Sequence, residues 1–231
     1  RMVYTVPDFQ NPTGVTLSLA RRKQLIALAN RHDLIVLEDT PYRHIRFKGQ
    51  NLPTLKSLDT EGRVLHLGSF SKILVPGLRV GWAVANPDLL ARMGCLKVAA
   101  DTQTSTLNMA AASLFLDRHD IAAHIATLCR AYARKKEAML DAIRRHFPQD
   151  ISATDPEGGL FTWVTFPEGF DATDYMRTVA LPQARVAYVP GETFFPLTPR
   201  ANHARLNYSA PSLEAIETGI AALGKALHAN H

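Results

Sequence analysis

Short apolar runs alternate with longer amphipathic segments in the first half of the chain. Four runs have the length and composition of buried strands: MVYTV (2–6), LIVLED (34–39), RVLHLGS (63–69) and VGWAVA (80–85). Segment 18–33 places its apolar residues along one side of a helix, and Ser18 is the expected N-cap. Strands and helices in alternation predict an α/β layer structure with a mainly parallel sheet.

The second half of the chain follows a different pattern. Apolar residues recur at helical spacing from 119 to 147, without Pro or Gly until Pro148, and this long helix is expected to link two domains. Strand-like runs separated by turns follow at 158–166, 185–191 and 204–212, with one short helix among them. A closing helix is predicted from Leu213 to Leu227, capped by Ser212. This half therefore predicts a smaller α+β domain, with the division of the chain at 118/119.

The composition of the chain is typical of a globular protein and argues against a nucleic-acid-binding patch and a membrane span. The chain has 231 residues, of which 46% are hydrophobic and 20% charged, which is enough to bury a substantial core. The net charge is +5, but Lys and Arg are scattered, so the basic clusters are interpreted as solvated helix faces rather than as a nucleic-acid patch. No apolar run approaches the ~18 residues of a membrane span, and no membrane partner is expected.

Cysteine and histidine give no metal motif. Cys95 and Cys129 are far apart and lack metal-ligand spacing, which together with the absence of a signal peptide favours a cytoplasmic location. Nine histidines occur without an HExxH pattern, and His44 and His66 are interpreted as packing or surface residues. A strand-like run begins almost at residue 1, so the chain is expected to be a piece of a longer protein whose upstream portion is missing.

Polar residues cluster where the predicted strands end. Lys72 lies in GSFSKILVPGLRVGW (68–82), just past an apolar run, and ligands of open α/β sheets bind at that edge. Taken singly, each such residue has an ordinary explanation as a solvated lysine, a helix cap, a turn former or a surface arginine. The residues concerned are Asn11, Asp39, Ser69, Ser71, Lys72 and Arg79. Their joint occurrence in this order favours a functional site.

Five motifs carry a family resemblance: NPTG (11–14), EDTPY (38–42), SFSK (69–72), PGLR (76–79) and RLNYS (205–209). Together they resemble the fold-type I pyridoxal-phosphate (PLP) aminotransferases of class I/II. The chain is most similar to the branch that holds α-aminoadipate and broad-specificity aminotransferases, which also includes the aminotransferase-like domain of certain bacterial transcription regulators. The resemblance implies that 1–118 is the C-terminal part of the PLP-binding large domain, incomplete at its N-terminal side. Residues 119–231 would be the linking helix and small domain.

The resemblance assigns the catalytic roles. Lys72 matches the lysine that holds the cofactor as an imine and later moves a proton, two tasks that an amine can perform. Asp39 matches the carboxylate that keeps the pyridine nitrogen protonated. Strand alternation places the neighbouring Glu38 on the opposite face, so Asp39 is favoured for this role.

The remaining assignments concern the phosphate, the phenolic oxygen and the substrate. Ser69, Ser71 and Arg79 match the phosphate ligands, Ser69 more firmly than Ser71. Asn11 and Tyr42 match donors to the cofactor's phenolic oxygen. Arg205, inside a strand-like run, matches the arginine that binds the substrate α-carboxylate. Asn11 is also assigned to substrate binding. A packed loop tyrosine at 42 and a structural salt bridge at 205 remain the alternatives.

The implied activity is transfer of an amino group between an α-amino acid and a 2-oxo acid by a ping-pong mechanism, in a homodimer. Two alternatives remain. One is the effector domain of a transcription regulator with a winged helix upstream, the one case in which nucleic acid would be a partner. The other is a different fold-type I PLP enzyme, such as a lyase. Residues 1–231 alone are expected to bind PLP weakly and not to turn over.

Overall fold

The computed structural model describes residues 1–229 and divides into two compact units. The first contains Arg1–Asp8 and Val15–Leu128, and the second contains Phe9–Gly14 and the chain from Cys129 onward. The boundary falls inside helix α5 (Ile121–His146), whereas the sequence placed it ahead of that helix. Each unit has its own four-stranded sheet.

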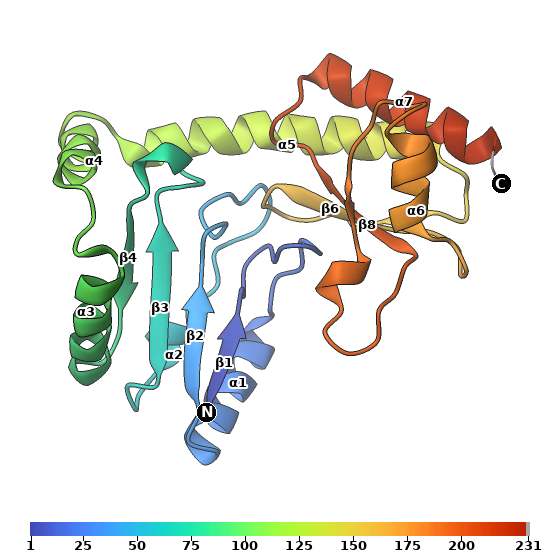
Figure 1. The fold of residues 1–231 in the computed structure, drawn as a ribbon. Coiled ribbons are helices and arrows are strands. Elements are labelled where there is room, and N and C mark those ends of the chain that lie inside the picture. The colour runs from blue at the N-terminus through green and yellow to red at the C-terminus, as the bar shows by residue number, and fades with distance from the viewer. Residues whose placement is uncertain (230–231) are drawn as a thin grey trace. The chain divides into compact units, whose positions relative to one another are not determined.

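The sheet of the first unit has the order β1–β2–β3–β4 (Figure 1). Its strands are β1 (Met2–Thr5), β2 (Ile35–Asp39), β3 (Val64–Ser69) and β4 (Gly81–Val84). The pairs β1–β2 and β2–β3 are parallel and β3–β4 is antiparallel. All four strands were predicted, and the mainly parallel sheet is confirmed.

Helices cover one face of this sheet. Helix α1 (Leu19–Arg31) begins where Ser18 accepts a hydrogen bond from the Arg21 amide at 3.3 Å, so the predicted cap is confirmed. Together with the short α2 (Leu55–Leu58), α1 packs on β2 and β3. The buried residues of this layer are Ile26, Ala29, Val36, Leu55 and Val64. The opposite face includes Met2 and Tyr4, which are both exposed.

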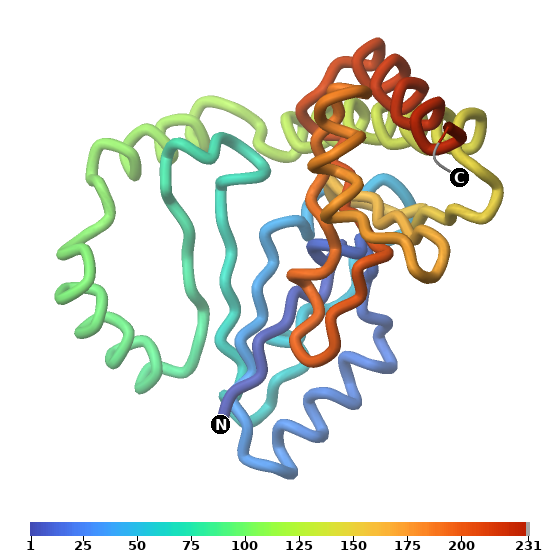
Figure 2. Tube along the Cα trace, turned by 45° about the vertical axis from the view of Figure 1, so that its right-hand side comes forward, coloured from blue at the N-terminus to red at the C-terminus, as the bar shows by residue number. Residues whose placement is uncertain are grey.

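Two helices of the first unit were not predicted from the sequence. They are α3 (Pro87–Asp101) and α4 (Thr106–Arg118), and Figure 2 shows their chain running outside the β4 edge of the sheet. No residue of α3 is buried, and α4 buries Ala112. Their apolar residues lie all around the helix rather than along one stripe, so the helical period is weak in the sequence. Leu96, Val98 and Leu107 stay exposed.

The second unit is an antiparallel sheet with helices, as expected for a small α+β domain. The sheet has the order β5 (Ser152–Ala153), β6 (Phe161–Thr165), β8 (His203–Asn207) and β7 (Val189–Pro190). The helices are α5, the short α6 (Ala172–Tyr175), which continues as a π turn over Met176–Ala180, and α7 (Leu213–Ala229). Ser212 caps α7 by accepting from the Ala215 amide at 3.1 Å, as predicted. Strand β7 is shorter than the predicted 185–191, and the left-handed backbone of Arg185 (φ 57°) shows that the extended run does not begin at 185.

Between residues 1 and 229, none of the helices has both the length and the hydropathy needed to cross a membrane.

Candidate active site

Six of the predicted site residues come from one edge of the first unit's sheet. Asp39 ends β2 and Ser69 ends β3, and because these strands are parallel, both residues lie at the carboxyl edge. Strand β4 is antiparallel and begins at Gly81, opposite Ser69 in the register. The connection from 70 to 80, which carries Ser71, Lys72 and Arg79, therefore lies at the same edge.

Hydrogen bonds shape the loop that carries Lys72. The Ser71 amide donates to Ser69 Oγ at 3.0 Å, and the Leu74 amide closes a turn on the Phe70 carbonyl at 2.8 Å. Lys72 lies within this turn and its side chain is half-buried. These hydrogen bonds hold the backbone of Lys72 at the end of β3.

The segment that follows the lysine turn is a 3-10 turn over Pro76–Leu78 that ends at Arg79. Arg79 has a left-handed backbone with φ 52°, which is uncommon for a residue with a side chain. Asn108 of α4 donates from Nδ2 to the Leu78 carbonyl at 3.0 Å. Helix α4 thus fixes the turn that presents the Arg79 guanidinium.

Glu38 and Asp39 point to opposite faces of β2, as alternation predicted. Glu38 is fully buried on the α2 side, where it accepts hydrogen bonds from the amides of Leu55 at 2.7 Å and Lys56 at 2.9 Å. The ring Nδ1 of His66 donates to the same carboxylate at 3.0 Å. Burial alone would raise the pKa of Glu38, but these hydrogen bonds outweigh it and hold the pKa below its usual value.

Asp39 lies on the other face, where it meets a residue that the sequence did not single out. The Tyr4 hydroxyl of β1 donates to Asp39 Oδ2 at 2.7 Å. Tyr4 pairs with Leu37 in the sheet register, so its side chain shares the face of Asp39. The sequence pattern predicted that Tyr4 lies in a strand. It could not predict the register between β1 and β2, which brings Tyr4 next to Asp39.

Tyr42 lies in the turn that follows β2. Its carbonyl accepts from the Ile45 amide at 2.8 Å and its side chain is 7% exposed. Just before it, Thr40 donates from Oγ1 to the Leu67 carbonyl of β3 at 2.8 Å, which joins the ends of the two strands. The turn is therefore tied to the same sheet edge as Asp39.

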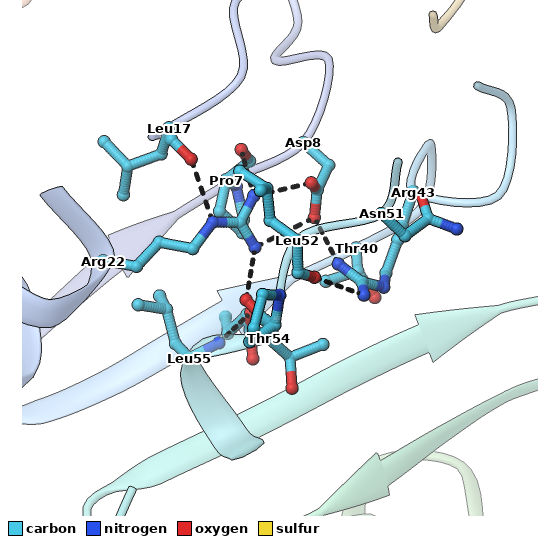
Figure 3. Close-up of polar contacts among 12 residues, drawn as sticks. Pro7, Asp8, Leu17, Arg22, Thr40, Arg43, Asn51, Leu52, Thr54 and Leu55 are labelled. Carbon is cyan, nitrogen blue, oxygen red and sulfur yellow. Dashed lines mark hydrogen bonds and ion pairs between the residues drawn. The ribbon is translucent and has the colours of Figure 1, made fainter. Parts of the chain in front are cut away.

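A buried ionic cluster lies next to the turn of Tyr42 and was not predicted from the sequence (Figure 3). The Arg22 guanidinium of α1 contacts Asp8 at 2.6 Å, with neither side chain exposed to solvent, and it also donates to the carbonyls of Leu17 and Pro7. Arg43 donates to the second oxygen of Asp8 at 3.1 Å. The cluster thus joins the residues after β1, the start of α1 and the turn of Tyr42.

The other two predicted site residues lie together in the second unit. Arg205 of β8 donates from Nη1 to Asn11 Oδ1 at 2.7 Å. The Arg205 guanidinium also lies over the Phe161 ring, 4.3 Å from its centroid, so an aromatic surface holds the cation in one orientation. The amide oxygen of Asn11 is one partner of this cation, whereas the carboxylate partner expected for Arg205 stays a prediction.

The loop 9–14 presents Asn11 through close backbone packing. Gly14 has φ +74°, and a Cβ there would come within 2.9 Å of Pro156. The Gly14 amide donates to the Gln10 carbonyl at 2.6 Å, and Thr154 Oγ1 donates to the Thr13 carbonyl at 3.2 Å. Glycine is therefore required at the end of NPTG in this fold.

Comparisons with known proteins agree with the sequence motifs. Residues 5–223 match the family described as "Aminotransferase class I and II". Aromatic-amino-acid aminotransferase 1 of Thermococcus litoralis is 40% identical over 227 residues, 98% of this chain and 54% of that protein. The 2-aminoadipate transaminase of Thermus thermophilus is 38% identical over 230 residues, 98% of this chain and 57% of that protein. The chain thus spans about half the length of these relatives.

Solved structures and regulators give two further comparisons. Kynurenine aminotransferase of Pyrococcus horikoshii, solved in complex with PMP, superposes with a TM-score of 0.95 at 40% identity, covering 100% of this chain and 56% of that one. An uncharacterized HTH-type transcriptional regulator of Bacillus subtilis is 32% identical over 225 residues, 96% of this chain and 45% of that protein. The fold is that of the fold-type I PLP-dependent aminotransferases. With nearly its whole length matched by the family, this chain belongs to the class I and II aminotransferases.

Proposed function

We propose that the complete protein, of which this chain is part, is a PLP-dependent aminotransferase that moves an amino group between an α-amino acid and a 2-oxo acid by a ping-pong mechanism. One observation carries the proposal. A lysine, a carboxylate, two hydroxyls and a guanidinium converge on the carboxyl edge of a single sheet. The residues are Asp39, Ser69, Ser71, Lys72 and Arg79.

The chemistry of this donor set fits PLP. The cofactor carries a phosphate, a basic ring nitrogen and an aldehyde, which call for cationic or hydroxyl donors, a carboxylate and an amine respectively. Lys72 is half-buried and Arg79 is exposed, so both side chains remain accessible to a ligand. When bound, PLP supplies an electron sink for the pair of electrons released at the substrate α-carbon.

Lys72 would provide the amine that binds the cofactor covalently and then holds and moves the proton of the α-carbon. Asp39 would keep a negative charge against the ring nitrogen, with Tyr4 fixing one of its oxygens. Arg79 offers the two-pronged geometry that suits a phosphate, and Ser69 and Ser71 offer hydroxyl donors.

Asn11 and Arg205 are proposed as the substrate-binding pair. Because Asn11 Oδ1 accepts from Arg205, the Asn11 amide nitrogen is left as a donor, which suits the phenolic oxygen of the cofactor. The guanidinium of Arg205 would bind the substrate α-carboxylate through two parallel hydrogen bonds. Tyr42, which the EDTPY motif assigns to the cofactor's phenolic oxygen, would be a second donor to that oxygen.

The test is a half-reaction with the complete protein loaded with PLP. Single amino acids, including aromatic ones, 2-aminoadipate and alanine, should each be added without an oxo acid. An aminotransferase releases one equivalent of the matching 2-oxo acid and stops until an acceptor such as 2-oxoglutarate is added. Continuous product formation without acceptor would instead indicate a lyase.

A regulator domain is the second candidate, favoured by the match to the Bacillus subtilis regulator over 96% of this chain. A regulator would bind PLP or an amino acid without turnover, and its complete sequence would contain a winged helix ahead of residue 1. Sequencing the parent reading frame and measuring binding of the complete protein to its own promoter region separate the two candidates.

We also propose that the complete protein is a homodimer, as the resemblance implies. Support comes from α3 and α4, where Leu96 is 70% and Leu107 is 76% exposed, because apolar helix faces of this kind are typical of interfaces. Sedimentation of the complete protein tests this proposal, and a monomer at all concentrations would contradict it. The cytoplasmic location stays a prediction of the sequence.

A further inference from the structure

Tyr4 and Asp39 form a contact that none of the five motifs contains. Tyr4 lies in the middle of β1, seven residues before Asn11, and Asp39 is the last residue of β2. The phenol donates to Asp39 Oδ2 at 2.7 Å, a short distance for a hydrogen bond between a hydroxyl and a carboxylate. Since both residues lie on regular strands of one sheet, the backbone holds the two groups in place.

The neighbouring acidic residue cannot take over this contact. Glu38 faces the helix side of the sheet, where His66 and the amides at the start of α2 bind its carboxylate. His66 therefore supports Glu38 and not Asp39. Each carboxylate of the Glu38–Asp39 pair has its own donor, on its own face of β2.

Tyr4 acts as a donor across the whole neutral range. Partial desolvation of the hydroxyl, together with the hydrogen bond to Asp39 and the negative charge of its carboxylate, raises the pKa of Tyr4 to about 12. The hydroxyl therefore keeps its proton at neutral pH and donates it to Asp39 Oδ2. Rotation of the Asp39 carboxylate would break this hydrogen bond.

We propose that Tyr4 is a positioning residue for Asp39, which holds Oδ2 and so leaves the second carboxylate oxygen of Asp39 to bind the protonated ring nitrogen of the cofactor. The inference rests on the proposed function, because it assigns Asp39 to that nitrogen. Tyr4 itself is not a catalytic residue, since it acts through the carboxylate. Without the phenol, the carboxylate would rotate and share its charge with water.

The test is Tyr4→Phe in the complete protein loaded with PLP, which removes one hydroxyl from a side chain that is 60% exposed here and so leaves the packing nearly unchanged. We expect Lys72 to be labelled by borohydride as in the wild type. With PLP labelled by ¹⁵N, the ring nitrogen signal should move toward the unprotonated value, and the dissociation constant for PLP should rise severalfold. We expect kcat to fall about tenfold, or ~1.4 kcal/mol of barrier, with KM for the amino acid nearly unchanged.

A double-mutant cycle separates a role of Tyr4 that acts through Asp39 from an effect on the protein that is independent of Asp39. On the Asp39→Asn background, Tyr4→Phe should cause no further change in ¹⁵N signal or PLP affinity, because Tyr4 acts through the carboxylate. Tyr132→Phe, a phenol on α5, serves as the matched control and should leave all readouts unchanged.

The outcomes also separate this inference from the proposed function. An unchanged ¹⁵N signal and PLP affinity in Tyr4→Phe, or equal losses on the Asp39→Asn background, would overturn the role of Tyr4 while leaving transamination intact. If the wild-type protein binds PLP but does not transaminate, the proposed function fails. The ¹⁵N and affinity readouts then still decide the Tyr4 inference, because they need no turnover.

Discussion

Arg205 donates a hydrogen bond to the side-chain oxygen of Asn11 over 2.7 Å, although 194 positions separate the two residues in the sequence. Both residues were predicted as site residues from separate motifs at opposite ends of the chain. The contact orients the Asn11 amide, because an oxygen that faces a guanidinium leaves the amide nitrogen on the other side. The pair therefore presents donors, and a carboxylate or a phenolate is the complementary ligand.

Arg205→Lys should weaken binding of both the amino acid and the oxo acid. Lysine keeps the charge but loses the planar pair of donors, so we expect both KM values to rise about tenfold to a hundredfold, the ~1.5–3 kcal/mol of a hydrogen bond to a charged group. The affinity for PLP should stay nearly constant. Steady-state kinetics and equilibrium dialysis measure the two quantities, and Arg177→Lys, at an exposed ion pair, is the control. An equal loss of PLP affinity would mark Arg205 as structural.

Lys72 should be the residue that borohydride fixes to PLP in the complete protein. Peptide mapping after reduction is expected to find the cofactor mass on the peptide that contains residues 69–72. Lys72→Arg should lose both the label and the absorption band of the bound cofactor, whereas Lys97→Arg, on the surface of α3, should keep both. A label on any other lysine would overturn the assignment.

Asp39→Ala should allow covalent attachment of PLP to Lys72 but reduce transamination by about a thousandfold, equivalent to ~4 kcal/mol of barrier. The physical reason is that an unprotonated ring nitrogen is a poor acceptor of electrons. Single-turnover kinetics by stopped flow measures the chemical step directly. If Asp39→Ala kept wild-type rates while Glu38→Gln lost them, the alternation argument for β2 would be wrong.

Glu38 should make the stability of the protein depend on acid pH. The pKa of Glu38 is lowered in the folded state, so its contribution is present above the unfolded pKa of about 4.3 and is lost as the pH falls through the lower folded value. Urea denaturation between about pH 3 and pH 7 should therefore show that the free energy of unfolding declines as the pH falls below the unfolded pKa of Glu38. Glu38→Gln should flatten that decline, and the exposed Glu168→Gln should not. An unchanged slope in Glu38→Gln would contradict the assignment.

Arg22→Met should destabilise the first unit strongly. Methionine keeps much of the apolar stem but leaves Asp8 buried with Arg43 as its remaining cation, and breaking a buried ion pair from one side costs about 3–5 kcal/mol. The neighbouring Arg21 is exposed, so Arg21→Met should change the free energy of unfolding by less than ~0.5 kcal/mol. Denaturant titration of both variants measures the difference, and similar values would mean that the cluster is not needed for stability.

The elements with a clear period were predictable from the sequence, and their caps were too. Helix α1 with Ser18, helix α7 with Ser212 and the strands β1 to β4 follow from apolar spacing and from local hydrogen bonding, which neighbouring residues determine. Alternation also separated Glu38 from Asp39 correctly. Helices α3 and α4 were missed because their apolar residues cover all sides, so no stripe marks them.

The candidate site was predictable where a motif carried it and not where tertiary contacts carried it. The motif residues from Asp39 to Arg79 gather at one sheet edge because parallel strands end together, which is a general rule. Tyr4, Asp8, Arg22 and Arg43 depend on strand register and on side-chain packing between distant segments. An arginine on an amphipathic helix is usually exposed, and nothing local distinguishes Arg22 from Arg21.

The six residues from Phe9 to Gly14 belong to the second unit, so the chain passes between units at 8–9, 14–15 and 128–129. A protease cut after Leu128 would therefore not release the second unit intact, because the downstream piece would lack residues 9–14, which contact Thr154 and Arg205. For the same reason, exchange of gene segments between relatives at this point would pair each Arg205 with an Asn11 from a different parent. Chimeras in this family should accordingly exchange 9–14 and the region from 129 onward as a set.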